Sequence, residues 1–231
     1  MPIIPSPLRR GFEALLEPFA RSLIAARVHP NAITTVGTFI LVAGGVAFGL
    51  GYARAGGGLL LLSGAVDMVD GKVARDGGLV SRFGAFYDST LDRIGEVALY
   101  TGIALSFLSG GIGREWVALT VGTTILALGA SITVSYARAR AEGLGLDCKV
   151  GIATRAERIL GLGVPTVLLG AGPNGYLLFA IVVLLGLTAV ITVGQRIVHV
   201  YRTTRVSETA AKPRAAPPAM VDVLGKGRSS G

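Results

Sequence analysis

The sequence predicts an all-α, polytopic membrane protein in which six transmembrane helices follow an amphipathic interfacial helix. The 231-residue chain is 51% hydrophobic and only 16% charged, with a mean hydropathy of +0.63. It contains six apolar stretches of about 20 residues, the length that a helix needs to cross a bilayer, at residues 32–53, 57–75, 83–109, 114–141, 153–171 and 174–201. These stretches are too long for barrel strands and lack their strict alternation, so helices are expected.

The first element, residues 1–30, is too polar to span a membrane and too acidic for a cleaved signal peptide. Its charged residues lie opposite a set of apolar residues that recur at three- and four-residue steps. The apolar set is Phe12, Leu15, Leu16, Phe19, Leu23 and Ile24. This periodicity predicts an amphipathic helix on the membrane surface. Packing of the helix on the inner ends of the spans is the alternative. His29-Pro30-Asn31 predicts a break before the first span.

Charge placement orients the spans. With a cytoplasmic N-terminus, the outer segments hold only Arg54 and Arg114, and the other 20 of the 22 Lys and Arg residues fall on the inner side. This positive-inside pattern predicts a multi-pass protein of the cytoplasmic membrane, with both termini and the functional site facing the cytoplasm. The net charge of +8 is explained in the same way, because a basic cytoplasmic surface suits anionic lipid headgroups. No nucleic-acid-binding motif is present, so no nucleic-acid partner is expected.

Composition divides the chain into three regions. Residues 1–30 form the juxtamembrane helix and residues 31–205 the six-helix transmembrane domain. Residues 206–231 are rich in Pro, Ser, Lys and Arg and cannot bury a core, which predicts a disordered cytoplasmic tail. Cys148 is the only cysteine, which excludes an internal disulfide and a cysteine-based metal site.

The strongest functional signal is a group of aspartates inside the second and third apolar stretches. A carboxylate at bilayer depth costs several kcal/mol, so it normally faces a polar cavity, a partner or a metal. Asp67 and Asp70 are three residues apart, and Asp88 and Asp92 are four apart, so each pair shares one face of a helix. The alternative is that each aspartate is neutralised by an intramembrane ion pair with Arg75, Arg82 or Arg93.

Oxygen ligands without His or Cys favour a hard cation, Mg2+ or Mn2+, with Ca2+ as a competitor. Four carboxylates exceed what one Mg2+ needs, which favours two ions that could clamp a diphosphate. One of the acids could instead act as a general base on a hydroxyl group. Small residues, Gly71, Ala74 and Gly84, continue the same helix faces, so a ligand could approach the backbone beside the metal.

The string Asp67-x2-Asp70-Gly71-x2-Ala74-Arg75-x8-Gly84-x3-Asp88-x3-Asp92 resembles the signature of the CDP-alcohol phosphotransferase family at every fixed position. The six spans and the N-terminal helix are similar to that family as well. The resemblance implies a CDP-linked donor, usually CDP-diacylglycerol, and an alcohol acceptor that attacks the lipid-bearing phosphorus and releases CMP. It also implies a homodimer.

The same resemblance implies roles for individual residues. Asp67, Asp70 and Asp88 would hold the metals, and Asp92 would be the catalytic base with a share in metal binding. The donor nucleotide would be bound by a group from two segments: Asn31, Thr34, Asp67, Gly71, Ala74 and Arg75.

Residues 136–158 resemble the actinobacterial branch of the family, which makes phosphatidylinositol phosphate from inositol 1-phosphate. In that branch arginine forks bind the acceptor phosphate, since guanidinium groups contact phosphate bidentately; here they would be Arg138, Arg155, Arg158 and Arg196. The chain departs from the branch at Thr154 and Ala156, where Glu and Pro are expected. Glycerol 3-phosphate suits the same arginines, so a phosphatidylglycerophosphate synthase is the alternative. Arginines that serve only topology and anionic lipid are a further alternative.

Two other classes stay open on the residues alone. A membrane prenyltransferase also uses Asp-rich motifs, Mg2+ and a diphosphate, but with more spans and other spacing. A cation transporter would place acids near the midplane of several helices, whereas here they cluster at the inner ends of two.

Overall fold

The computed structural model describes residues 6–152 and 154–211, with side chains over 16–152 and 154–205, and every regular element in these ranges is a helix. The prediction of an all-α protein is thereby confirmed. Seven α-helices are joined by short connections and single helical turns: α1 Ser6–Ala25, α2 Pro30–Gly49, α3 Ala53–Asp76, α4 Arg82–Ser106, α5 Val117–Gly143, α6 Arg155–Leu169 and α7 Tyr176–Ala211.

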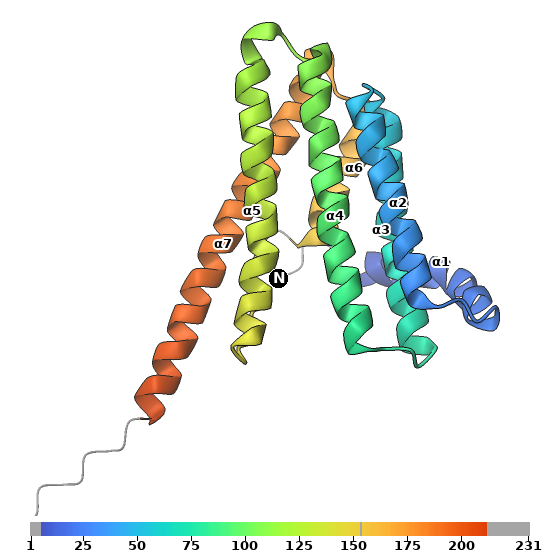
Figure 1. Ribbon diagram of the computed structural model, residues 1–231, viewed down its shortest axis with the longest axis vertical. Helices are drawn as coiled ribbons and strands as arrows, with labels where there is room; N and C mark the ends of the chain where they lie inside the picture. Colours follow the sequence, from blue (N-terminus) through green and yellow to red (C-terminus); the bar gives the residue numbers. More distant parts are fainter. Residues whose placement is uncertain (1–5, 153, 212–231) are drawn as a thin grey trace, which may run out of the picture.

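Helices α2 to α7 run alternately up and down in one elongated bundle (Figure 1). Helix α2 packs against α3 and α4, α3 against α6, and α5 against α7. Helix α1 lies across the bundle near the end where α3 connects to α4 (Figure 1). The other end carries the α2–α3, α4–α5 and α6–α7 connections, so the topology agrees with an even number of crossings.

Four helical segments are long and apolar enough to cross a membrane, which indicates an integral membrane protein: Pro30–Gly49, Arg82–Gly111, Arg114–Gly143 and Pro173–Arg205. Two of the six predicted spans do not meet these criteria among the described residues. Helix α6 has 15 residues, or about 22 Å of length at 1.5 Å per residue. The C-terminal end of α3 is charged, with five ionisable side chains from Asp67 to Asp76.

The described half of α1 packs on the bundle. Ala20 is fully buried in a small cluster with Ile33, Val69 and Val73, whereas Phe19 is 68% exposed. The buried Ala20 agrees with the alternative prediction, in which this helix packs on the spans. The exposed Phe19 leaves one apolar side chain that could contact lipid at the membrane surface. Residues 1–5 lie outside the described residues.

Helices α1 and α2 are separated as the His29-Pro30-Asn31 motif predicts. Helix α1 ends at Ala25 and α2 begins at Pro30, whose fixed φ suits a first helical position. The His29 ring accepts a hydrogen bond from the Asn31 backbone N–H at 3.2 Å and so caps the helix.

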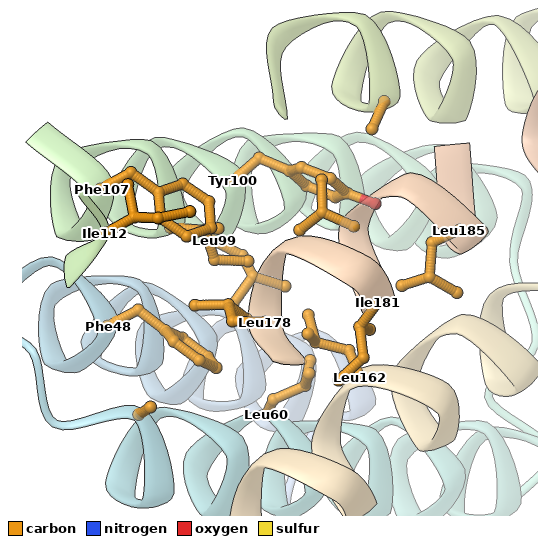
Figure 2. Packing of buried hydrophobic residues seen from close by; sticks show 14 of the residues in the cluster. Phe48, Leu60, Leu99, Tyr100, Phe107, Ile112, Leu162, Leu178, Ile181 and Leu185 are labelled. Atoms are coloured by element: carbon orange, nitrogen blue, oxygen red, sulfur yellow. The ribbon is translucent and has the colours of Figure 1, made fainter. Parts of the chain in front are cut away.

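The hydrophobic core fills the half of the bundle away from the aspartates. Phe48, Leu60, Leu99, Phe107 and Leu178 are its central residues (Figure 2). All five are at most 5% exposed, so burial of these side chains holds α2, α3, α4 and α7 together.

Two glycines allow α2 and α4 to touch through their backbones. A Cβ on Gly102 would stand 1.8 Å from the Gly45 carbonyl oxygen, and a Cβ on Gly45 would stand 2.5 Å from the Ala98 oxygen. No larger residue fits this contact, which sets the distance between the helices that carry Thr34 and the second aspartate pair.

Helix α7 continues to Ala211, six residues into the region predicted as the tail. Residues 212–231, the rest of that region, lie outside the described residues.

Candidate metal centre and active site

Three of the four predicted aspartates come together. Asp67 and Asp70 from α3 and Asp88 from α4 each offer a carboxylate oxygen, and these oxygens all lie within 4.8 Å of one another. The convergence depends on where α4 begins: the Ser81 hydroxyl accepts the Gly84 N–H at 2.9 Å, which caps the helix two turns before Asp88. The i, i+3 spacing predicted the shared face on α3, and packing of α4 supplies the third ligand.

These residues fit a divalent cation. Asp70 is only 6% exposed, and burying several carboxylates together is costly without a compensating positive charge. Asp88 Oδ1 is buried and has no hydrogen-bond partner within the described part of the chain. An oxygen in that position is suited to metal ligation, and the all-carboxylate set favours Mg2+ or Mn2+.

Helix α2 contributes directly to this carboxylate group. The Thr34 hydroxyl donates to Asp70 Oδ2 at 2.7 Å, and both residues are buried. A hydrogen bond of this kind orients a metal-binding carboxylate. The family resemblance groups Thr34 with the nucleotide-binding residues, and in the structure its hydroxyl contacts the aspartate.

The other residues predicted to bind nucleotide lie on α2 and α3, and two of their side chains lie against small residues. Gly71 and Ala74 are half-buried, and the exposed Arg75 guanidinium lies 3.1 Å from the place of a Cβ on Gly71. Asn31 Oδ1 lies 3.4 Å from the corresponding point on Gly84. The Arg75 and Asn31 side chains therefore lie close against the two predicted small residues Gly71 and Gly84.

Asp92 is paired with an arginine instead of joining the other three acids. Its Oδ1 lies 2.5 Å from the Arg155 guanidinium, which also donates to Asp67 Oδ1 at 3.0 Å. Arg155 opens α6 behind a Thr154–Glu157 capping box, in which the Thr154 N–H bonds Glu157 Oε2 at 2.6 Å. The cap fixes the first turn of α6, so Arg155 bridges α3 and α4 from a third helix.

Of the ion-pair partners considered from sequence, Arg93 lies 3.6 Å from Asp92 Oδ2. Arg155, which the sequence assigned to the acceptor phosphate, is the closer partner.

A second buried charge cluster lies one helical turn beyond Asp92. Glu96 accepts hydrogen bonds from Arg93 on its own helix and from the Ser131 hydroxyl on α5. Arg158, 7% exposed, extends from α6 to within 3.3 Å of Glu96 Oε1. Sequence reasoning missed Glu96, although the i+4 step from Asp88 through Asp92 continues directly to it.

Two small cavities adjoin these charges. One of about 10 Å³ is lined by Thr34, Asp67, Asp70, Asp92 and Arg155 among others. The other, about 40 Å³, shares Asp92 and Arg155 and extends to Glu96, Tyr100 and Arg158. The Asp92–Arg155 pair thus stands between the carboxylate group and a cavity that two arginines line.

The two remaining predicted arginines lie on α5 and α7. Arg138 is half-exposed and pairs with Glu142 at 2.8 Å. Arg196 is buried, and its guanidinium donates to the Val134 carbonyl and, at 3.0 Å, to the Val150 carbonyl. Neither side chain is among those that line the two cavities.

Comparison with known proteins agrees with this geometry. The sequence profile of the CDP-alcohol phosphatidyltransferase family matches residues 27–201. The phosphatidylinositol phosphate synthase of Cutibacterium acnes is 40% identical over 154 residues, which is 66% of this chain and 72% of that protein. The enzyme of the same name from Streptomyces avermitilis is 35% identical over 96% of this chain and 90% of its own length.

A solved structure shares the fold. The Mycobacterium tuberculosis phosphatidylinositol phosphate synthase with CDP-DAG bound superposes with a TM-score of 0.69 at 32% identity, over 80% of this chain and 92% of that one. The same protein in complex with manganese and citrate gives a TM-score of 0.69 at 32% identity, over 80% and 88% of the two chains.

Proposed function

This chain belongs to the CDP-alcohol phosphatidyltransferase family, and from that premise we propose that it transfers the phosphatidyl group of CDP-diacylglycerol to inositol 1-phosphate. The products are phosphatidylinositol phosphate and CMP. The observation that carries this proposal is the meeting of Asp67, Asp70 and Asp88 beside a cavity lined by Arg155 and Arg158. Acids that suit a cation and arginines that suit a phosphate are what a diphosphate donor and a phosphorylated acceptor require.

The carboxylate group binds the donor. Asp67, Asp70 and Asp88 would hold two Mg2+ or Mn2+ ions, which supply charge neutralisation at the diphosphate when bound. Asp67, Asn31, Thr34, Gly71, Ala74 and Arg75 surround the nucleotide end, with Thr34 acting through Asp70. The similar M. tuberculosis structures with CDP-DAG bound and in complex with manganese and citrate support this arrangement.

Asp92 serves as the base for the acceptor. It accepts the proton of the attacking hydroxyl, whose oxygen bonds to the lipid-bearing phosphorus as the bond to CMP breaks. Its neighbour Arg155 holds the carboxylate from one side, and the same guanidinium faces the cavity that would take the acceptor. The positioning of base, acceptor and donor contributes to the rate together with charge neutralisation at the diphosphate.

The predicted arginines select a phosphorylated acceptor. Arg155 and Arg158 line the larger cavity, and Arg138 and Arg196 would contribute to the acceptor phosphate site as the family resemblance implies. The similarity to proteins named phosphatidylinositol phosphate synthase supports our choice of inositol 1-phosphate over glycerol 3-phosphate as the acceptor of this chain.

For the membrane arrangement we propose six crossings, with α3 and α6 completing the four apolar helices. The α1 helix then lies at the cytoplasmic surface, residues 31–205 form the catalytic domain and residues 206–231 the cytoplasmic tail, in a homodimer in the cytoplasmic membrane. Figure 1 supports this topology, since α1, the α3–α4 connection and the ends of α5 and α7 lie toward the same end.

The test is CMP release from CDP-diacylglycerol by purified protein with Mg2+ and, in turn, inositol 1-phosphate, glycerol 3-phosphate, free inositol or serine. We expect release with inositol 1-phosphate and its loss in Asp92→Asn. A preference for glycerol 3-phosphate would keep the family and overturn the acceptor. Consumption of a prenyl diphosphate instead, or metal flux in liposomes without CMP release, would overturn the reaction itself.

A further inference from the structure

We propose that Glu96 is a positioning residue for the acceptor phosphate, which acts by holding the Arg158 guanidinium at the wall of the larger cavity. The inference deepens the proposed function and rests on it for the identity of the acceptor. Glu96 lies outside the aspartate signature, two helical turns beyond Asp88 on α4.

The contacts of Glu96 join three helices. Its side chain is 13% exposed and meets Arg93 on α4, the Ser131 hydroxyl on α5 and Arg158 on α6. The same Arg158 Nη1 that lies 3.3 Å from Glu96 also donates to the Ser131 carbonyl at 3.5 Å. Oxygens from α4 and α5 therefore hold one edge of the Arg158 guanidinium.

The other edge of that guanidinium is available. Arg158 Nε is buried and has no hydrogen-bond partner among the residues that the structure describes, and Arg158 lines the cavity with Arg155. An unpartnered guanidinium N–H in a buried wall indicates an anionic ligand, because leaving such a donor unsatisfied is costly.

Glu96 is unsuited to contact that ligand itself, because a carboxylate repels a phosphate. Both of its oxygens are engaged by donors, Oε1 by Ser131 and Arg158 and Oε2 by Arg93. A glutamine keeps the shape but presents one NH2 donor, which cannot bond a guanidinium. When that NH2 faces Arg158, this arginine loses its anchor and must be ordered when the acceptor binds.

The experiment compares steady-state kinetics of the full-length protein and Glu96→Gln. We expect the KM for inositol 1-phosphate to rise by about tenfold or more, the order of loss when a charged hydrogen bond is removed, while kcat and the KM for CDP-diacylglycerol stay within about twofold. Ser131→Ala, which removes one anchor of Glu96 but keeps its charge, shifts the same constant by a smaller factor. Glu115→Gln, the same change at an exposed position near the opposite end of the bundle, leaves all three constants unchanged.

A double variant tests whether Glu96 acts through Arg158. In an Arg158→Lys background, Glu96→Gln should change the acceptor KM by less than about twofold, because coupled residues are not additive. Effects that multiply in the double variant would overturn the inference. So would an equal loss in all three constants, or an unchanged acceptor KM.

Calorimetric binding of inorganic phosphate separates this inference from the proposed function, since it requires no turnover. Wild-type protein that binds phosphate about tenfold more tightly than Glu96→Gln, yet releases no CMP, would reject the reaction and keep the role of Glu96. Equal binding by the two proteins, or no binding by either, would reject that role.

Discussion

Thr34→Val tests the link between α2 and the metal-binding carboxylates. Thr34 is buried and donates to Asp70 Oδ2 at 2.7 Å. Valine has nearly the same shape but no hydroxyl, so the change removes this hydrogen bond and leaves a buried carboxylate oxygen less satisfied. A hydrogen bond to a charged acceptor contributes about 1.5–3 kcal/mol, and about 1.4 kcal/mol is a factor of ten. We therefore expect metal affinity to fall about 10- to 100-fold.

The assay is CMP release as a function of Mn2+ or Mg2+ concentration, with CDP-diacylglycerol and acceptor held at saturation. The half-saturating metal concentration rises in Thr34→Val, and much of the rate returns at high metal concentration. Thr133→Val is the matched control, because Thr133 is exposed on α5 and its hydroxyl donates to the Gly129 carbonyl of its own helix at 2.7 Å.

An unchanged metal dependence would refute the reasoning that Thr34 orients a metal ligand. If the KM for CDP-diacylglycerol rises at saturating metal while the metal dependence stays constant, Thr34 acts on the nucleotide, as the family resemblance implies.

Three further predictions follow from the same structure. Gly102→Ala forces a Cβ against the Gly45 oxygen and should destabilise the fold by about 1–3 kcal/mol, measured as a lower melting temperature in detergent. Gly129→Ala, which has open space around its Cβ, should leave the melting temperature unchanged. Equal melting temperatures for the two variants would refute the close contact. Hydrogen bonds from Lys72 and then Arg21 lower the pKa of Glu17 below its usual 4.5. The contribution of ionised Glu17 to the docking of α1 is therefore present above pH 4.5 and is lost as the pH falls through the lowered pKa. Glu17→Gln should reduce the amide protection of α1 at pH 7 and abolish the further loss of protection below about pH 4.5; amide protection equal to that of the wild type would contradict this prediction. EDTA should abolish CMP release and Mn2+ restore it, whereas full activity in EDTA would contradict a metal requirement.

The helices and the aspartate faces were predictable because both depend on residues close together in the chain. Apolar length predicts a helix wherever about 20 residues must satisfy their backbone in lipid. The three-residue step from Asp67 to Asp70 places both carboxylates on one face of any α-helix. Convergence of Asp88 with them was expected from the family resemblance and is present in the structure.

The sequence alone therefore determined an all-α membrane protein with a carboxylate site at one end, since hydropathy and helical periodicity are local properties. Only the tertiary structure decided that Thr34 bonds Asp70, that Arg155 bridges Asp67 and Asp92, and that Glu96 holds Arg158. Each contact joins helices whose separation and rotation are set by packing, as at the α2–α4 backbone contact. Spacing along one helix carries no information about which residue of another helix will face it, and that pairing decides which charges neutralise each other and which are left for a ligand.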